Sequence, residues 1–360
     1  MRVRTLSLTD FRNYSSVELE LSGGLTALVG ANGEGKSNIL EALAWLTTLS
    51  SFRGAPTEAL VRKGAPFAIV RATVERDRRE LLIESQLQRS GRTRVQVNQQ
   101  PLRRARELLG LLRATVFTPD DLELVKGGPA DRRRFLDEVL IMLHPRNDAL
   151  RAEVERIIRQ RTALLKQAGG RLDDAALVTL DVWDAKLASA GEALAVARSE
   201  LLQRLQPALA ATYDAVARRP VPATATYEAP WRQVGLGEAL ARARGDDVRR
   251  GVCTVGPHRD DVALTINGSP ARTHASQGEM RTLALALRLA VHQVVTDETG
   301  AAPVVLLDDV FSELDVERSR ALLANLPDAQ TVVTAADGLP TEAQPDVVLR
   351  VAGGTITPVD

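Results

Sequence analysis

The eight residues from Gly30 to Ser37 have the types and the spacing of a phosphate-binding loop. They match the pattern G-x-x-x-x-G-K-S at every fixed position. In such a loop backbone N–H groups surround the β-phosphate, Lys36 reaches the β and γ oxygens, and the Ser37 hydroxyl ligates Mg²⁺. The alternative is a glycine turn that merely caps a helix, but the strand predicted before the loop and the helix after it favour phosphate binding. We predict that ATP binds to Gly30, Ala31, Asn32, Gly33, Glu34, Gly35, Lys36 and Ser37.

Two adjacent carboxylates follow an apolar run near the other end of the sequence. Residues 304–307 have the composition of a buried strand and deliver Asp308 and Asp309 at its carboxyl end. In this Walker B pattern, Asp308 would hold Mg²⁺ directly or through water, and Asp309 would act as a base or orient the attacking water. Apolar runs that end in acids are common, so the assignment depends on the pairing with the phosphate loop. We therefore predict Lys36, Asp308 and Asp309 as catalytic residues, and Ser37 and Asp308 as metal ligands.

A second anion-binding motif precedes Asp308 by 32 residues. The sequence Ser276-Gln277-Gly278-Glu279, followed by helical spacing over residues 280–294, resembles the signature S-G-G-Q of ABC ATPases. The Ser276 hydroxyl, the Gly278 amide and the amino-terminal end of the helix would together attract a phosphate. The same residues also match a helix cap with Glu279 at the third position, and the two interpretations are compatible.

Two phosphate-binding surfaces imply that two subunits enclose one nucleotide between them. Directly after the acids, residues 312–315 (Ser-Glu-Leu-Asp) resemble the D-loop that runs along the seam of such dimers. The γ-phosphate supplies contacts across this interface that ADP lacks. We therefore expect a homodimer that depends on ATP.

The elements expected around the phosphate loop are mostly strands. Alternating apolar and polar residues predict a hairpin over residues 3–8 and 17–21, and a short apolar run predicts a buried strand over residues 25–29. Helical spacing follows over residues 37–49. Further strands of an antiparallel meander are expected at residues 67–74, 80–87 and 94–97.

Residues 131–216 are rich in Ala, Leu, Arg and Glu at spacings of three and four, which predicts a helical lobe. Gly169 and Gly170 interrupt the pattern. The lobe should therefore contain an antiparallel pair of helices, each of about 25 to 35 residues or about 40 to 50 Å. Prolines end this region, and strand-like alternation resumes over residues 251–266.

The two nucleotide motifs lie far apart, because 272 residues separate Lys36 from Asp308. A single β-α-β nucleotide fold needs far fewer, so the ATPase core is interrupted by an insertion. This split favours ATPases of the ABC, Rad50 and SMC type over small P-loop kinases. We predict an α/β fold, namely an ABC-type P-loop ATPase head similar to those of Rad50 and SMC, with an inserted α-helical lobe. The head would comprise residues 1–112 and 250–360, and the lobe residues 113–249.

The composition argues against several classes of protein. The 360 residues are 44% hydrophobic and 26% charged, which suits a folded core, and no segment approaches the roughly 20 apolar residues of a membrane helix. The first ten residues lack the apolar region of a secretory signal, so we expect a cytoplasmic protein without membrane contact. Cys253 is the only cysteine and the four histidines are scattered, which argues against disulfides and a structural metal cluster.

The charge is balanced overall but uneven along the chain. Lys and Arg number 46, and so do Asp and Glu. Residues 62–113 hold 13 basic and 5 acidic residues, whereas residues 297–360 hold 3 basic and 12 acidic ones. The basic segment could bind a phosphate backbone, or it could be a solvated surface without a partner, and the sequence alone leaves both open.

Four further strings of residues lie outside the ATPase motifs. They are residues 10–14 (Asp-Phe-Arg-Asn-Tyr), 116–122 (Val-Phe-Thr-Pro-Asp-Asp-Leu), 126–137 (Lys-Gly-Gly-Pro to Arg-Arg-Arg-Phe-Leu-Asp) and 256–261 (Gly-Pro-His-Arg-Asp-Asp). With these strings and the ATPase motifs, the chain resembles the RecF family over essentially its full length. The last two strings are more specific than the Walker motifs. By themselves they would indicate only a basic helix start and a polar turn.

The resemblance implies a head that dimerises on ATP and binds double-stranded DNA, preferably beside a single-strand gap. RecF-like proteins act with RecO and RecR to place RecA on gaps covered by single-strand binding protein, in DNA repair and replication. The resemblance also implies that Arg12 and Asn13 line the nucleotide. Contacts from Arg and Lys to DNA phosphates would weaken steeply with salt.

Three features depart from the pattern of ABC transporters. Asp309 stands where transporters carry a glutamate, from which we expect slow hydrolysis and a switch rather than a motor. The strand expected at residues 331–334 leads to Ala335, without the usual switch histidine. No Q-loop residue can be chosen among Gln96, Gln99 and Gln100.

Two other functions remain as alternatives. The energy-coupling subunit of a membrane transporter would have to explain the helical lobe and the missing switch histidine. An architectural SMC-like protein would need coiled coils hundreds of residues long, and the sequence contains none.

Overall fold

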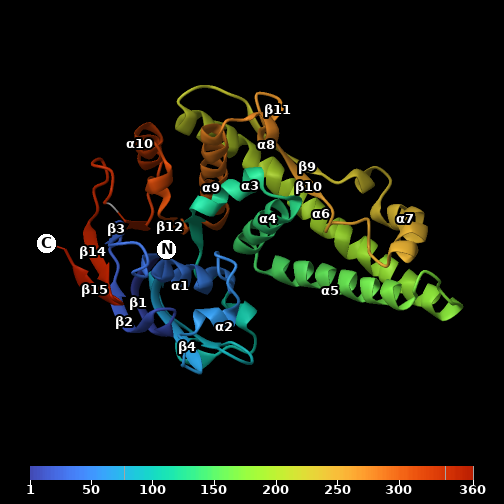
Figure 1. Cartoon of the computed structure of the whole chain (residues 1–360), viewed down its shortest axis with the longest axis horizontal. Coiled ribbons are helices and arrows are strands. Elements are labelled where there is room, and N and C mark those ends of the chain that lie inside the picture. Colours follow the sequence, from blue (N-terminus) through green and yellow to red (C-terminus); the bar gives the residue numbers. More distant parts are fainter. Residues whose placement is uncertain (77, 337, 360) are drawn as a thin grey trace. The chain divides into compact units, whose positions relative to one another are not determined.

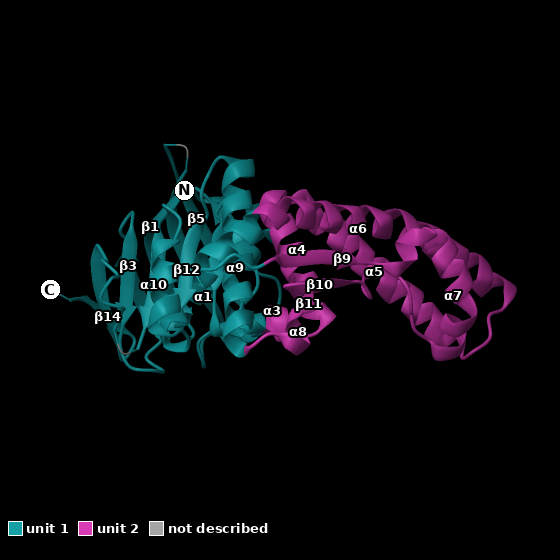
Figure 2. Ribbon diagram, turned by 90° about the horizontal axis from the view of Figure 1, so that it is seen from above, with its two compact units in different colours: residues 1–122, 208–221, 277–360 teal, residues 123–207, 222–276 magenta. Residues whose placement is uncertain are grey.

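The computed structural model of the chain (Figure 1) describes residues 1–76, 78–336 and 338–359. These residues form two compact units, coloured teal and magenta in Figure 2. Unit 1 comprises residues 1–122, 208–221 and 277–360, and unit 2 comprises residues 123–207 and 222–276.

The units end at different residues from the expected head and lobe. β8 (Ala114–Phe117) pairs with β12 (Val304–Asp308), which adds the segment after residue 112 to unit 1. β10 (Asp261–Ile266) pairs with β9 (Ala223–Glu228), which keeps residues 250–276 in unit 2. Strand partners far along the chain determine these boundaries, and a local sequence pattern does not show which partner a strand will have.

The first sheet of unit 1 is antiparallel and has the order β2-β1-β4-β5-β6-β7. Its strands are β1 (Arg2–Phe11), β2 (Tyr14–Glu20), β4 (Phe67–Arg76), β5 (Arg79–Gln88), β6 (Arg94–Val97) and β7 (Gln100–Pro101). Val3, Leu6 and Leu8 of β1 are buried, while the residues between them are less so, as expected of a strand with one face on the core. The predicted hairpin and meander are confirmed.

The second sheet of unit 1 carries the nucleotide motifs and has the order β15-β14-β3-β13-β12-β8. Besides β8 and β12, its strands are β3 (Leu25–Val29), β13 (Thr331–Ala335), β14 (Val347–Ala352) and β15 (Thr355–Pro358). All are parallel except β15, which pairs antiparallel with β14. Parallel strands end at the same edge of a sheet, so the loop after β3 and the acids of β12 meet at one edge.

Helices and the first sheet cover the second sheet on both faces, which explains its continuous apolar strands. Residues of α1 (Lys36–Thr48) share one buried apolar cluster with both sheets. Residues of α9 (Gln277–Thr299) and α10 (Val316–Ala324) pack in a second cluster with β12 and β13. The short elements of unit 1 are α2 (Thr57–Leu60), η1 (Ala105–Leu108), η2 (Pro119–Leu122) and η4 (Val310–Glu313).

Unit 2 consists of helices and a small antiparallel sheet in the order β11-β10-β9. The remaining elements are α3 (Glu123–Lys126), α4 (Pro129–Leu143), α5 (Arg146–Gln167), α6 (Asp174–Ala217), η3 (Pro230–Gln233), α7 (Leu236–Arg250), β11 (Ser269–Pro270) and α8 (Ala271–His274). The expected helix lengths are wrong, because α5 has 22 residues and α6 has 44. α6 continues through Pro207, and its last turns belong to unit 1. Helical spacing marks a face but does not mark where a helix ends.

The strand expected over residues 251–266 is wrong in its first part. Only β10 is a strand there, and residues 251–260 form turns and bends. Gly251 and Gly256 have φ of +64° and +130°, a region that strand residues do not adopt. As a separate finding, none of the helices in the described ranges has the length and apolar composition needed to span a membrane.

Candidate nucleotide-binding site

The phosphate loop connects the end of β3 to the start of α1. Gly30 and Gly35 have φ of +155° and +110°, a backbone region that favours glycine. A side chain at either position would also collide with a neighbour. A Cβ on Gly30 would lie 2.2 Å from the Val351 carbonyl oxygen, and one on Gly35 would lie 2.4 Å from Asn13 Nδ2. Close packing thus fixes the shape of the loop, as a backbone cradle for phosphate requires.

The turn between β1 and β2 supports the loop through side-chain hydrogen bonds. Asn13 Nδ2 donates to the Glu34 carbonyl at 2.9 Å, and the Tyr14 hydroxyl donates to the Gly35 carbonyl at 3.0 Å. Asn38 of α1 donates to Asn13 Oδ1 at 2.8 Å. Burial, and then the charge of Glu34, raise the pKa of Tyr14, so its hydroxyl keeps the proton that it donates. Asn13 therefore lies at the loop, and its contact with the nucleotide stays a prediction.

Arg12 binds Glu41 of α1. Its Nε and Nη2 donate to the two carboxylate oxygens at 2.8 and 2.7 Å, and Glu41 is fully buried. Arg12 Nη1 also donates to the carbonyl of Ala59. This bidentate pair fixes α1 against the turn between β1 and β2. Arg12 therefore has a structural role. The contact with the nucleotide that was also expected of it stays a prediction.

Lys36 lies at the start of α1 with its ammonium inside the loop. It is buried, and it donates to the carbonyls of Gly30 and Ala31 at 2.6 and 2.9 Å. Among the described residues no carboxylate oxygen lies within 4.0 Å of it. A buried cation that has only neutral acceptors is well suited to bind an anion, and phosphate oxygens would replace the carbonyls.

Asp308 at the end of β12 is buried and lies close to the phosphate loop. Burial raises the pKa of its carboxyl group, and hydrogen bonds from the hydroxyls of Ser37 and Thr334 act in the opposite direction. The bond from Thr334 Oγ1 to Asp308 Oδ1 is 2.9 Å long. The structure thus brings together the two predicted metal ligands, Ser37 and Asp308. Both supply hard oxygen atoms and therefore fit Mg²⁺.

Thr334 is a site residue that the sequence reasoning missed. It lies at the end of β13, is 1% exposed, and accepts a hydrogen bond from the backbone N–H of Asp309 at 2.8 Å. Asp309 has φ of +50° and ψ of +30°, so the threonine holds the second acid in a left-handed conformation. The available signal was the position of Thr334 directly before Ala335, where a switch histidine was sought.

The signature residues lie at and before the start of α9. Ser276 is exposed and Gly278 is half-buried. Arg318 of α10 packs against the glycine, since a Cβ on Gly278 would lie 2.5 Å from Arg318 Nη2. Arg318 also binds Asp315 of the expected D-loop and donates to Thr282 at 3.3 Å. The exposure of Ser276 is what a motif that completes a partner's site requires.

The glutamines considered for the Q-loop lie in the first sheet. Gln96 is on β6, Gln99 follows that strand, and Gln100 begins β7. Gln96 Nε2 donates to Glu84 of β5 at 2.6 Å. They therefore belong to the antiparallel sheet and not to the sheet that carries the nucleotide motifs.

Known proteins resemble the chain along nearly its whole length. The family model described as RecF/RecN/SMC N terminal domain matches residues 2–351. The DNA replication and repair protein RecF of Beutenbergia cavernae is 43% identical over 394 residues, which cover 99% of each chain. That of Rhodococcus erythropolis is 42% identical over 367 residues, which cover 93% of this chain and 90% of the relative. The chain belongs to the RecF family.

Solved structures of RecF proteins share this fold. Two structures of the recombination mediator protein RecF in the RecFOR pathway, RecF-ATPrS and RecF-ATP, both give a TM-score of 0.91, at 29% and 28% identity. They cover 100% and 99% of this chain, and this chain covers 98% and 97% of theirs. An Smc head bound to the C-winged helix domain of ScpA gives a TM-score of 0.59 at 18% identity, over 100% of this chain and 97% of the other.

These findings confirm the predicted fold, an ABC/SMC-type ATPase head with a helical insertion. The likeness to the Smc head concerns the fold alone, because the sequences are only distantly similar. The likeness to the RecF family concerns the function as well, because the relatives are 42–43% identical over nearly the whole chain. The chain is accordingly an ATP-binding protein of DNA replication and repair.

Proposed function

We propose that the protein binds ATP with Mg²⁺, dimerises around it, and in that form binds double-stranded DNA next to single-strand gaps. In recombinational repair and replication restart it would help RecR, together with RecO, to load RecA. Slow, DNA-stimulated hydrolysis would end the dimeric state, so that ATP acts as a switch. The protein would act on chromosomal DNA in the cytoplasm. Membership of the RecF family and the geometry of the nucleotide site support this proposal.

The observation that carries the proposal is the set of contacts at the edge of the second sheet. There Lys36 lies inside the phosphate loop, and the hydroxyl of Ser37 bonds to Asp308. Lys36 would bind the β and γ oxygens, and Ser37 and Asp308 would hold Mg²⁺, which supplies charge neutralisation at the phosphates. Asp309 would orient or deprotonate the attacking water. Ser276 and Gly278 would bind the γ-phosphate held by the other subunit.

The test combines DNA binding with oligomeric state. Gel shifts on a gapped duplex at several salt concentrations, and sedimentation velocity, would be run with and without ATP. We expect ATP to increase both the DNA affinity and the dimer fraction. If ATP changes neither, the proposal is refuted.

Lys36→Ala should lose ATP binding, ATP-dependent dimerisation and ATP-dependent DNA binding together. The charge-assisted bonds of the ammonium contribute about 1.5–3 kcal/mol, so ATP affinity should fall at least about tenfold, as measured by titration with a fluorescent ATP analogue. The matched control is Lys166→Ala, which removes an exposed lysine of α5 and should leave all three properties unchanged. A Lys36→Ala protein that still dimerises with ATP would contradict the assignment.

A further inference from the structure

Two of the strings that carry the family resemblance, residues 126–137 and 256–261, have no part in the nucleotide site, yet they meet in unit 2. Arg132 Nε and Nη2 donate to the two carboxylate oxygens of Asp261 at 2.7 and 3.0 Å. Arg133 Nη1 donates to the backbone carbonyl of Asp260 at 2.6 Å. Contacts between the strings therefore explain why Arg132 and Asp261 are present. They leave the positive charges of Arg133 and Arg259 without such an explanation.

Both adjacent carboxylates in this cluster already have strong partners. Asp261 is bound by Arg132 in the bidentate pair. Asp260 is 1% exposed and accepts from the hydroxyl of Tyr227 at 2.5 Å and from the indole N–H of Trp231 at 2.6 Å. The oxygens of these acids are thus committed to other donors, and a further cation nearby would lack a carboxylate of its own.

The guanidinium groups of Arg133 and Arg259 lie beside these acids and have no carboxylate partner among the described residues. Arg133 is half-buried and donates to the Asp260 carbonyl, and Arg259 is exposed and donates through Nε and Nη2 to the Cys253 carbonyl at 3.2 and 3.1 Å. Within the described part of the chain, neither has a carboxylate oxygen within 4.0 Å. Burial lowers the pKa of the neighbouring His258, and the hydrogen bond to the Cys253 carbonyl raises it. Arg259 and Arg133 both act on this ring and lower its pKa, so the two guanidiniums lie near one another.

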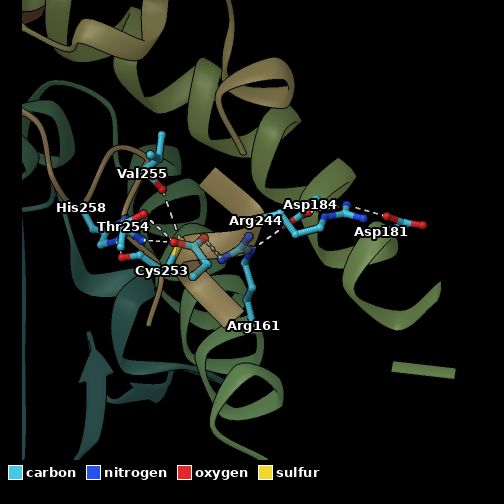
Figure 3. A network of polar contacts seen from close by, with 9 residues as sticks. Arg161, Asp181, Asp184, Arg244, Cys253, Thr254, Val255 and His258 are labelled. Carbon is cyan, nitrogen blue, oxygen red and sulfur yellow. Dashed lines mark hydrogen bonds and ion pairs between the residues drawn. The ribbon is translucent and has the colours of Figure 1, made fainter. Parts of the chain in front are cut away.

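A buried ion network (Figure 3) fixes the turn at Cys253, whose carbonyl accepts from the side chain of Arg259. Arg161 of α5 donates to Asp184 of α6 at 2.6 Å. It also donates to Asp247 of α7 at 2.6 Å. Asp247 in turn accepts from the backbone N–H of Thr254 at 2.9 Å, which fixes the turn around Cys253. Three helices thus anchor this turn, and a site on a rigid scaffold holds its charges in place without further ordering on binding.

We propose that Arg133 and Arg259 form a phosphate-binding site on unit 2, and that its ligand is the sugar-phosphate backbone of nucleic acid. Guanidinium groups match phosphate oxygens with paired N–H donors. Because Arg259 is exposed, the site suits a polyanion that passes over the surface and gains affinity from many contacts. This inference rests on the DNA binding proposed above and assigns part of it to unit 2.

The test measures the affinity of the full chain, with ATP and Mg²⁺, for a fluorescent gapped duplex over a range of KCl concentrations. Each lost phosphate contact lowers the slope of log K against log salt by about 0.9, which corresponds to about eightfold in affinity at about 0.1 M salt. We expect this loss for Arg133→Gln and for Arg259→Gln, and twice the slope change in the double variant. The matched control is Arg242→Gln, because Arg242 is exposed on α7 and pairs with Glu238. It should change the slope by less than half as much.

Thermal unfolding checks that the variants are folded. If Arg133→Gln does not fold, Arg133→Lys replaces it. This variant keeps the charge and should retain the wild-type slope, whereas Arg259→Gln should still show the slope reduced by one phosphate contact. Wild-type slopes in both glutamine variants would overturn the inference and leave the proposed function intact. A wild-type protein that does not bind the duplex with ATP would instead refute the proposed function. Inorganic phosphate could instead raise the unfolding temperature of the wild type but not that of Arg259→Gln, while the glutamine variants keep the wild-type DNA slope. A free anion would then be the ligand, and the inference would also be overturned.

Discussion

A single hydroxyl group, that of Thr334, connects both acids of the Walker B strand to β13. It donates to Asp308 and accepts from the backbone N–H of Asp309, so both its donor and one acceptor position are used. The backbone of Asp309 is thereby fixed, and among the described residues its carboxylate makes no capping hydrogen bond. The carboxylate would therefore be available for the role in hydrolysis proposed above.

Asp309→Asn should keep the fold and ATP binding but lose hydrolysis. Asparagine tolerates the left-handed conformation found at this position, so the backbone should not change. Phosphate release should fall by about 100-fold or more, the range typical of a lost general base. Asp328→Asn, at an exposed position outside the Walker B strand, is the control and should hydrolyse ATP normally. Normal phosphate release by Asp309→Asn would dismiss the role as a base.

His292 of α9 should make the protein less stable in acid. It is 2% exposed, its Nε2 has no hydrogen-bond partner among the residues that the structure describes, and burial lowers its pKa to about 4. Below about pH 6.5 the unfolded chain binds a proton at this residue that the folded chain does not bind until about pH 4. The free energy of unfolding should therefore decrease over this range as the pH falls, by about 3 kcal/mol from this residue alone.

His292→Leu should remove that part of the pH dependence. Urea unfolding at pH 7 and pH 4.5 would show a difference smaller by about 2–3 kcal/mol than in the wild type. His274→Leu, at an exposed histidine, should retain the wild-type difference. Equal pH dependence in wild type and His292→Leu would contradict the effect of burial.

The phosphate loop and the two acids could be predicted from the sequence because phosphate and metal chemistry demands fixed residue types at fixed spacing. Thr334 and the pair of Arg12 with Glu41 could not. Each of these depends on a partner that the fold brings from another strand or helix. The threonine also lies in a strand whose sequence is otherwise that of any buried strand.

At the level of elements, the strands of the first sheet could be predicted because burial on one face leaves a clear period in the sequence. β3 and β12 could be predicted because strands covered on both faces are continuous apolar runs. The lengths of α5 and α6 could not be predicted, since neither a spacing of three and four nor Pro207 marks the end of a helix. Residues 251–260 alternate as a strand would, but they form turns, in which the backbone N–H of Thr254 donates to Asp247 of α7 and the carbonyl of Asp260 accepts from Arg133 of α4. The buried ion pairs of Arg161 with Asp184 and Asp247 help to fix this segment as a turn, because Asp247 also accepts from the backbone N–H of Thr254.

Arg161→Ala should strongly destabilise unit 2. The arginine is fully buried. Within the described ranges, its removal leaves Asp247 without a cation and Asp184 with only the ion pair to Arg244. We expect a loss of about 3–5 kcal/mol in the free energy of unfolding, measured by chemical denaturation. Arg242→Ala breaks an exposed pair and should cost less than about 1 kcal/mol. Similar losses in both variants would mean that the buried network contributes no more than a surface pair.

For the whole molecule, the exposed Ser276 provides a test of the proposed dimer. Ser276→Arg should bind ATP as a monomer but fail to dimerise, because a long cation at the seam would collide with the partner and its nucleotide. Sedimentation velocity with ATP would detect the loss. Thr273→Arg introduces the same side chain at an exposed position outside the motif and should dimerise normally. Normal dimerisation of Ser276→Arg would refute the sandwich arrangement.

The order of strands in the second sheet has a consequence for the newly made protein. β3 lies between β13 and β14, and Gly30 packs against the carbonyl of Val351. Ribosomes therefore complete the phosphate loop about 300 residues before they make the strands that shape it. We therefore expect that a nascent chain does not bind nucleotide during most of its translation. We expect the same of a truncated product that ends before β14, although it carries every residue of the motif.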